Sequence, residues 1–158
     1  MKKFELTDEF VTNVFGHKLF RIKALVAFGD VEKGELGGFI EKEDNLSHDD
    51  NAWVFGNAQV SGNARVCGNA QVFGNADYAV VAGFGRYFRT TTFFRCKDKI
   101  LRVQCGCFYG DLAQFREIVK KTHGDSKYAK EYLAIADLME LHFSDKCGGE
   151  QMNDGKIY

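Results

Sequence analysis

Four near-copies of a six-residue unit follow one another between residues 54 and 76, where the chain reads VFGNAQVSGNARVCGNAQVFGNA. Aligned in columns, the units share one valine position and one alanine position, with Gly-Asn between them. The valines are Val54, Val60, Val66 and Val72, and the alanines are Ala58, Ala64, Ala70 and Ala76. A period of six fits neither the 3.6 residues of a helical turn nor a plain alternating strand. The repeat therefore predicts a stacked architecture in which each unit supplies one short strand and one turn.

This period is typical of parallel β-helices, in which each strand pairs with the strand one coil later, about 4.8 Å along the axis. Valine then points into the interior and alanine fits near a corner. Gly-Asn forms the turn because both residues tolerate unusual backbone angles. Extending the columns in both directions predicts a β-helix over residues 36–89, with Phe84 and Phe88 as a bulkier plug at its C-terminal end.

The tandem VxGNAx units resemble the left-handed β-helix of the hexapeptide acyltransferase superfamily, in which three hexapeptides form one triangular coil. That geometry implies that Phe55 stacks on Phe73 one coil away. Two flanking segments, GDVEKGELGGFIEKEDNLSHDDNAW and VQCGCFYGDLAQFREIVKKTHGDSKYAKEYL, resemble parts of small GNA-repeat proteins of bacteriophages and prophages. The resemblance implies a mainly β fold built on a short left-handed parallel β-helix, in a phage- or prophage-encoded protein.

The segments around the repeat predict a cap, a hairpin and two helices. Residues 1–35 are predicted to form an N-terminal β cap whose hairpin turns at residues 16–18. Residues 90–143 are predicted to form a β-hairpin followed by two helices, with Asp111 and Ser126 as their N-caps. The apolar stripe of the second helix is typical of core or of a subunit interface. Residues 144–158 are predicted to be a flexible tail.

Composition narrows the classes of partner. The chain has 158 residues and a net charge of −1, which gives no global attraction to nucleic acid. It has no apolar run long enough for a membrane span, so we expect a cytoplasmic protein with no membrane partner. Five cysteines without a CxxC pair are typical of free thiols in a reducing compartment. We expect neither a metal site nor a cofactor.

Catalytic patterns are missing from the sequence. It has no GxSxG, HExxH or phosphate-binding loop. His48 is the histidine nearest the repeat, and it falls in a column that elsewhere holds valine, which favours a hydrogen-bonded core or cap residue over a general base. No insertion loops out of the repeat, whereas the acyltransferases commonly build their site with one. We therefore predict a protein that is not an enzyme and has no catalytic residues.

One surface does stand out, between residues 86 and 102. Six basic residues and one acid give it a local charge of about +5 and aromatic residues lie among them, a mixture that can hold phosphates and stack on bases. A solvated hairpin edge would have the same charges. The predicted partner-binding residues are Arg86, Arg89, Phe93, Phe94, Arg95, Lys97, Lys99 and Arg102, with Trp53, Phe55 and Phe73 as a secondary surface.

Function follows from the resemblance and from the lack of catalytic features. We expect a non-enzymatic phage anti-defence protein, similar to an anti-CRISPR, that binds and inhibits a bacterial immune effector. Its partner would be a host defence protein or ribonucleoprotein, or a nucleic acid or nucleotide. Two alternatives are a sponge that sequesters a cyclic nucleotide immune signal and a small hexapeptide-repeat acyltransferase. Self-association into a dimer or trimer is expected.

Overall fold

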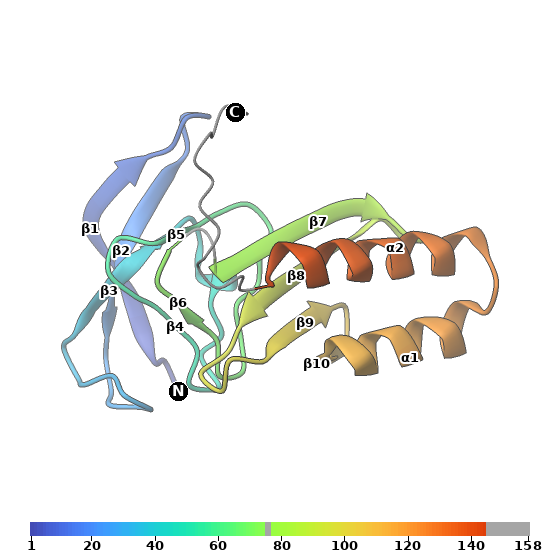
Figure 1. Cartoon of the computed structure of the whole chain (residues 1–158). Coiled ribbons are helices and arrows are strands. Elements are labelled where there is room, and N and C mark those ends of the chain that lie inside the picture. Colours follow the sequence, from blue (N-terminus) through green and yellow to red (C-terminus); the bar gives the residue numbers. More distant parts are fainter. Residues whose placement is uncertain (75–76, 145–158) are drawn as a thin grey trace, which may run out of the picture.

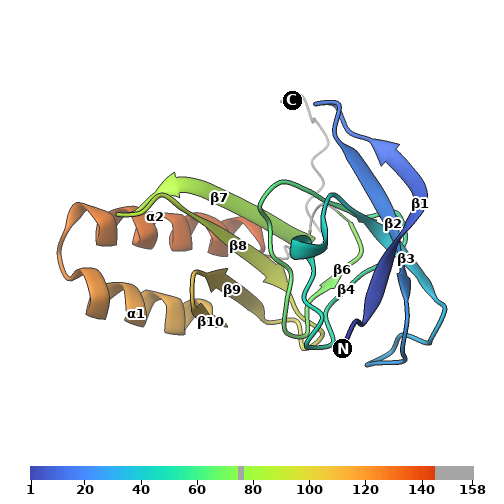
Figure 2. The ribbon, with the colours of Figure 1, turned by 180° about the vertical axis from the view of Figure 1, so that it is seen from behind.

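The computed structural model describes residues 1–74 and 77–144, and these form three small sheets and two helices. Figure 1 shows the first sheet (β1–β3) on one side of the molecule, the repeat in the middle, and the helices on the other side. The view from behind in Figure 2 shows the same order. The C-terminal sheet and its helices therefore lie on the far side of the repeat from the N-terminal hairpin.

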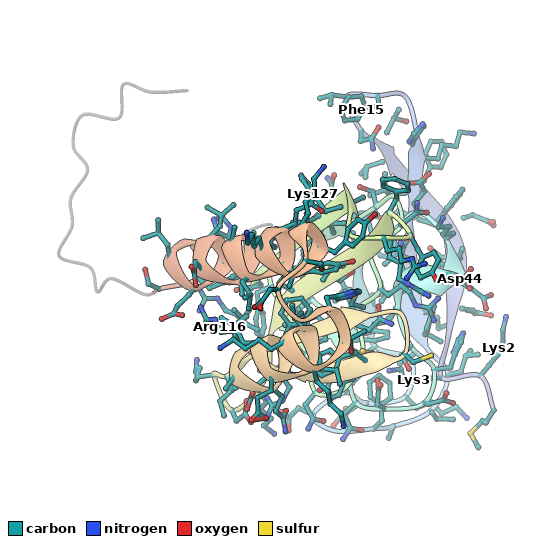
Figure 3. The ribbon with its side chains drawn as sticks, turned by 90° about the vertical axis from the view of Figure 1, so that its right-hand side faces the viewer. Lys2, Lys3, Phe15, Asp44, Arg116 and Lys127 are labelled. Carbon is teal, nitrogen blue, oxygen red and sulfur yellow. The ribbon has the colours of Figure 1, made fainter. Side chains whose placement is uncertain are left out.

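The N-terminal sheet has the order β1-β2-β3-β5, with β1 at Phe4–Thr12, β2 at Lys18–Ala24, β3 at Leu36–Ile40 and β5 at Gln59–Val60. β1 and β2 pair in an antiparallel manner, and this confirms the predicted N-terminal hairpin. Its turn is held by Asn13, whose side-chain oxygen accepts hydrogen bonds from the backbone N–H groups of Phe15 and His17 at 2.9 and 3.0 Å. Figure 3 shows Phe15 at the tip of this hairpin.

The repeat forms very short parallel pairs. β4 at Trp53–Val54 pairs with β6 at Gln71–Val72, and β3 pairs with β5. A short 3-10 helix, η1, spans Glu43–Asn45. The glycines of the first three units, Gly56, Gly62 and Gly68, have φ between 57° and 66°. Each of these turns therefore needs the left-handed conformation that glycine adopts at little cost.

The prediction of a left-handed parallel β-helix over residues 36–89 is wrong. Within the described residues there is no closed or solenoid sheet, and the parallel pairs belong to separate small sheets. The coil length is not constant, since Phe39 pairs with Gln59 but Trp53 pairs with Gln71. Because the first pair is twenty residues apart and the second eighteen, and each strand of the repeat itself has two residues, the ladders do not join into one continuous sheet.

The repeat nevertheless sets which side chains are buried. All four valines of the column are at most 1% exposed, and Ala58, Ala64 and Ala70 are at most 4% exposed. Ala76 lies outside the described residues. The column pattern thus predicts the core of this region correctly, although it does not predict the backbone pairing.

The C-terminal sheet is antiparallel, with the order β10-β9-β8-β7. Its strands are β7 at Tyr78–Phe84, β8 at Arg89–Arg95, β9 at Leu101–Cys105 and β10 at Phe108–Asp111. The hairpin predicted at the start of residues 90–143 is present as β8 and β9. The predicted plug is wrong: Phe84 and Phe88 are 43% and 71% exposed. They lie at the β7–β8 turn because residues 78–84 pair with β8 instead of continuing the repeat.

Two helices follow as predicted, α1 at Leu112–His123 and α2 at Lys127–His142. The Asp111 carboxylate accepts a hydrogen bond from the backbone N–H of Gln114 at 2.8 Å, and the Ser126 hydroxyl accepts one from Ala129 at 3.3 Å. The apolar stripe of α2 is buried against α1 and the sheet, so it is core within the chain. Residues 145–158 of the predicted tail lie outside the described residues.

Candidate functional site

The residues predicted as one basic and aromatic patch do not form one surface. Arg86 and Arg89 lie at the turn between β7 and β8. Lys97, Lys99 and Arg102 lie at or beside the β8–β9 turn, at the other end of β8. β8 has seven residues, and at about 3.3 Å per residue the two groups are about 20 Å apart. The patch is therefore divided into two basic ends.

Phe93 and Phe94 were predicted to stack on a ligand, and this is wrong because both are fully buried. Successive side chains of a strand point to opposite faces of its sheet. Phe93 accordingly packs against Phe115 of α1, with ring centres 6.0 Å apart, and Phe94 packs on the other face beside Tyr109, at 6.2 Å. The two rings belong to two different cores and cannot meet a partner.

At the β8–β9 end, carboxylates that are distant in sequence face the basic residues. Lys97 Nζ lies 2.8 Å from a carboxylate oxygen of Asp30 in the N-terminal region. Arg95 Nε lies 3.4 Å from Asp77 Oδ1. Lys99 is exposed at the tip with a φ of 70°. These pairings lower the charge that a partner would meet here, and the local sequence gave no sign of them.

Arg102 pairs with Asp98, the one acidic residue within the predicted basic patch. Its guanidinium lies 2.8 Å from Asp98 Oδ1, and this contact holds the pKa of the Asp98 carboxyl below its usual range. At the β8–β9 end, Arg95, Lys97 and Arg102 thus each form an ion pair, and Lys99 is the basic residue there that has none among the described residues. Such a set of ion pairs is more typical of a solvated hairpin edge than of a phosphate site.

The predicted secondary surface is only partly a surface. Trp53 is fully buried, so its prediction as a contact residue is wrong. Phe55 and Phe73 do stack as predicted, with ring centres 4.4 Å apart and planes 13° apart. Phe73 is 60% exposed, whereas Phe55 is half-buried. Only the outer ring of this pair is open to a partner.

The other basic end borders a pocket of about 330 Å³, which we call the helix-side pocket. Its walls come from the β7–β8 turn, the β9–β10 turn, α1 and the first half of α2. Its size is near the lower end of small-molecule sites, about 300–1,000 Å³. The lining residues are Arg86, Tyr87, Arg89, Cys105, Gly106, Cys107, Phe108, Phe115, Ile118, Val119, Thr122, His123 and Tyr132.

Two arginines and one aromatic ring stand at the mouth of the helix-side pocket. The guanidinium carbons of Arg86 and Arg89 lie 5.7 and 5.5 Å from the centre of the Tyr87 ring. All three side chains are exposed. Among residues 1–74 and 77–144, neither arginine forms an ion pair with a carboxylate. This end of the sheet therefore offers two guanidinium groups that are not in an ion pair, although the Glu131 carboxylate lies nearby and accepts a hydrogen bond from the backbone N–H of Gly85 at 2.9 Å.

The inner wall of the pocket is mainly aromatic. The Tyr132 hydroxyl donates a hydrogen bond to the carbonyl of Phe84 at 3.4 Å, and burial raises its pKa to about 12. The His123 ring stacks on Tyr132 with centres 5.9 Å apart. Cys105 Sγ accepts a hydrogen bond from the Thr91 hydroxyl at 3.2 Å. The wall can thus hold a planar apolar group, while the mouth can hold an anion.

His48 takes the structural position that the repeat predicted for it. Its Nδ1 accepts a hydrogen bond from the backbone N–H of Lys3 at 3.1 Å, and its ring stacks on Phe4 with centres 4.1 Å apart. Its Nε2 lies 3.2 Å from Glu43 Oε1. His48 thus joins the N-terminal strand to the repeat, as a hydrogen-bonded cap residue would.

Sequence reasoning missed most of the helix-side pocket. Phe115 and Ile118 of α1 and Cys105 of β9 were not predicted as site residues. Four segments that are far apart in the chain form the walls, so no local motif marks them. Only Arg86 and Arg89 were predicted binding residues that also line the pocket.

No protein-family model matches the chain, and no curated protein matches it. In the part of the chain that the structure describes, no helix is long and apolar enough to cross a membrane. Over the same ranges, no group of three or more His, Cys, Asp or Glu side chains could hold a metal ion.

Proposed function

We propose that this protein acts by binding and not by catalysis, and that it counters a bacterial defence system in the cytoplasm of an infected or lysogenic bacterium. In the form that the pocket favours, it sequesters a nucleotide signal used by such a system. Phosphate would bind Arg86 and Arg89, and the base would lie against Tyr87 and the aromatic wall. The resemblance of the two segments that flank the repeat to parts of small phage and prophage proteins supports the anti-defence role, which is an argument by analogy.

A single observation carries the nucleotide proposal. The helix-side pocket combines an aromatic wall with two exposed arginines that have no carboxylate partner among the described residues. Guanidinium groups bind phosphate oxygens through two parallel hydrogen bonds, and base faces stack on aromatic rings. An apolar metabolite would not need the arginines, and a simple anion would not need the rings.

The other expected functions have less support in the geometry. Docking on an immune effector through the basic patch would need the β8–β9 end, where Arg95, Lys97 and Arg102 are already paired with carboxylates. An acyltransferase would need a general base, yet His48 is engaged by Lys3 and Glu43. Self-association into a dimer or trimer stays a prediction. Because the α2 stripe is core, the exposed faces of the repeat are the expected contact.

Isothermal titration calorimetry with mononucleotides and with cyclic di- and oligonucleotides tests the proposal. We expect saturable heat with at least one nucleotide, and loss of at least about tenfold in affinity for Arg86→Ala because one phosphate contact is removed. Tyr87→Ala should weaken binding by a similar factor, since stacking on one base contributes about 1–3 kcal/mol. Tyr87→Phe keeps the ring and is the matched control.

If no nucleotide gives heat, capture of a nucleotide signal is wrong. If Tyr87→Phe is as weak as Tyr87→Ala, the ring does not act by stacking. Lys130→Ala removes one exposed positive charge on α2, away from the pocket, and should leave the affinity unchanged.

A further inference from the structure

A second hollow adjoins the helix-side pocket. It is open, has a volume of about 350 Å³, and is lined by Arg65, Arg89, Thr90, Gln104 and Gly106. Arg89 and Gly106 also line the helix-side pocket, so the two hollows meet at these residues. We call this second hollow the arginine groove.

The arginine groove reaches the opposite face of the C-terminal sheet. In the ladder between β8 and β9, Thr91 is opposite Cys105, which lines the helix-side pocket, and Thr92 is opposite Gln104, which lines the groove. Adjacent residues of a strand point to opposite faces. The two hollows therefore form one path that passes around the end of the sheet, from the helices toward the repeat.

The repeat supplies the far wall of the arginine groove. The backbone N–H of Arg65 donates a hydrogen bond to the Thr92 hydroxyl at 3.1 Å, which fixes this part of the repeat against β8. The Arg65 side chain is exposed, and within residues 1–74 and 77–144 no ion pair involves it. The groove thus has an arginine from each half of the molecule and no acidic residue in its lining.

A third hollow, of about 260 Å³, continues the path beyond Arg65 and Gln104, which it shares with the groove. Its lining includes the carboxylates of Asp44 and Asp49, and that of Glu43, which is already engaged by Lys2 and His48. Carboxylates repel phosphate but accept hydrogen bonds from the amino groups of bases. Along the path, phosphate is therefore favoured at Arg89 and Arg65, with a position suited to a base on either side.

From this order of pocket, groove and acidic hollow we infer that the ligand is a dinucleotide, and this inference rests on the proposed function. One base enters the helix-side pocket, and one of the phosphates that link the two nucleosides lies in the arginine groove between Arg89 and Arg65. The second base lies toward the acidic hollow. A mononucleotide fills the first position only, so Arg65 distinguishes the two classes of ligand.

Calorimetry on the full chain, with the wild type and Arg65→Ala, tests this inference. The probes are cyclic di-AMP and cyclic di-GMP, compared with AMP and GMP. We expect Arg65→Ala to weaken the binding of at least one cyclic dinucleotide by about tenfold and to leave the corresponding mononucleotide within about twofold. Lys33→Ala, which removes an exposed charge from the N-terminal region, is the charge-matched control.

Each result separates this inference from the proposed function. If a nucleotide binds and Arg65→Ala changes mononucleotide and dinucleotide affinity equally, or neither, the dinucleotide inference is overturned and the proposed function stands. If no nucleotide binds the wild type, both fail. A thermal melt of Arg65→Ala that matches the wild type shows that any loss of affinity is not loss of the fold.

Discussion

The repeat and the C-terminal sheet hold their backbones together in different ways. The sheet has strands of four to seven residues joined by regular ladders, and capped helices cover one face. The strands of the repeat have two residues each, so side chains complete the bonding. The fully buried Asn45 donates to the carbonyl oxygens of Gly62 and Ala64 at 3.1 and 2.9 Å. A strongly periodic sequence therefore does not by itself produce a regular backbone.

The difference in strand length between the two regions also explains where the candidate site lies. Turns between long strands meet the helices at one end of the C-terminal sheet, and this convergence creates the helix-side pocket. The repeat has close-packed valines and alanines inside, so it has little interior space. It contributes instead from outside, through Arg65. The repeat, which has the clearest sequence pattern, thus supports the C-terminal sheet, whose pattern is weaker but which forms the pocket.

The largest effect is expected where the two regions meet, at Phe93 and Phe94. Each substitution, Phe93→Ala or Phe94→Ala, should lower the free energy of unfolding by about 3–5 kcal/mol, because a large buried ring is lost and a cavity remains. Since β8 joins both cores, we expect the two regions to unfold together. Urea unfolding followed by Trp53 fluorescence, which reports the repeat, and by far-ultraviolet circular dichroism, which reports the helices, measures this.

Coincident transitions for both probes would support a single cooperative unit. Phe93→Ala could instead shift the unfolding transition seen by circular dichroism and leave the transition seen by Trp53 fluorescence unchanged. The repeat and the C-terminal sheet would then unfold independently, as separate domains. Phe15→Ala at the exposed hairpin tip is the control for loss of a ring (Figure 3), and its effect should stay within about 0.5 kcal/mol.

Asn45 tests whether side chains replace ladders in the repeat. Besides its two donated bonds, its side-chain oxygen accepts from the backbone N–H groups of Glu41 and Lys42 at 3.1 and 2.9 Å. Asn45→Ala removes four hydrogen bonds and should cost about 3–4 kcal/mol, measured by urea unfolding. Asn63→Ala changes an exposed asparagine of the repeat and should cost less than about 0.5 kcal/mol. Equal effects of the two changes would contradict the distinction.

The sequence predicted the fold best where signals were local. Hairpin turns, helix caps and the valine column each depend on a few neighbouring residues, and these predictions are confirmed. The β-helix was not predictable in this way because closure depends on a constant coil length, and residues 40–53 change it. Continuing the period past residue 77 also ignored the alternation that pairs β7 with β8.

The candidate site was predicted in part for a related reason. Charge counting within one segment found Arg86 and Arg89 but could not see that Asp30 pairs with Lys97 or that Asp77 faces Arg95. It also could not see that Phe93 and Phe94 point into two cores. Both errors come from contacts between residues that are far apart in the chain.

The ammonium group of Lys3 is buried at the N-terminal end of the repeat. Its contribution to the stability of the repeat can be tested by varying the pH. Lys3 Nζ donates hydrogen bonds to the carbonyl oxygens of Asp50 and Ala52, both at 2.8 Å, and lies 4.6 Å from the centre of the Phe28 ring. Its side chain is 4% exposed. Burial lowers the pKa of the Lys3 amine from 10.5 to about 8, although the Asp50 and Asp49 carboxylates oppose this shift.

The direction of the pH effect follows from this pKa. Between about pH 8 and 10.5 the unfolded chain keeps the Lys3 proton and the folded chain has lost it, so the Lys3 contribution to stability rises with pH. Below pH 8 both states are protonated, and the cost of burying the charge is constant. A shift of this size corresponds to about 3 kcal/mol. Because pH 10 lies below the unfolded-state pKa of 10.5, urea unfolding at pH 7.5 and pH 10 should show most of this gain, about 2 kcal/mol, in the wild type relative to Lys3→Met, which keeps an unbranched apolar stem and removes the amine. Other groups titrate equally in both proteins, so the difference between them isolates Lys3. Parallel pH profiles would mean that Lys3 stays charged in the folded chain, held by its two carbonyl contacts, the Asp50 carboxylate at 3.8 Å and the Phe28 ring.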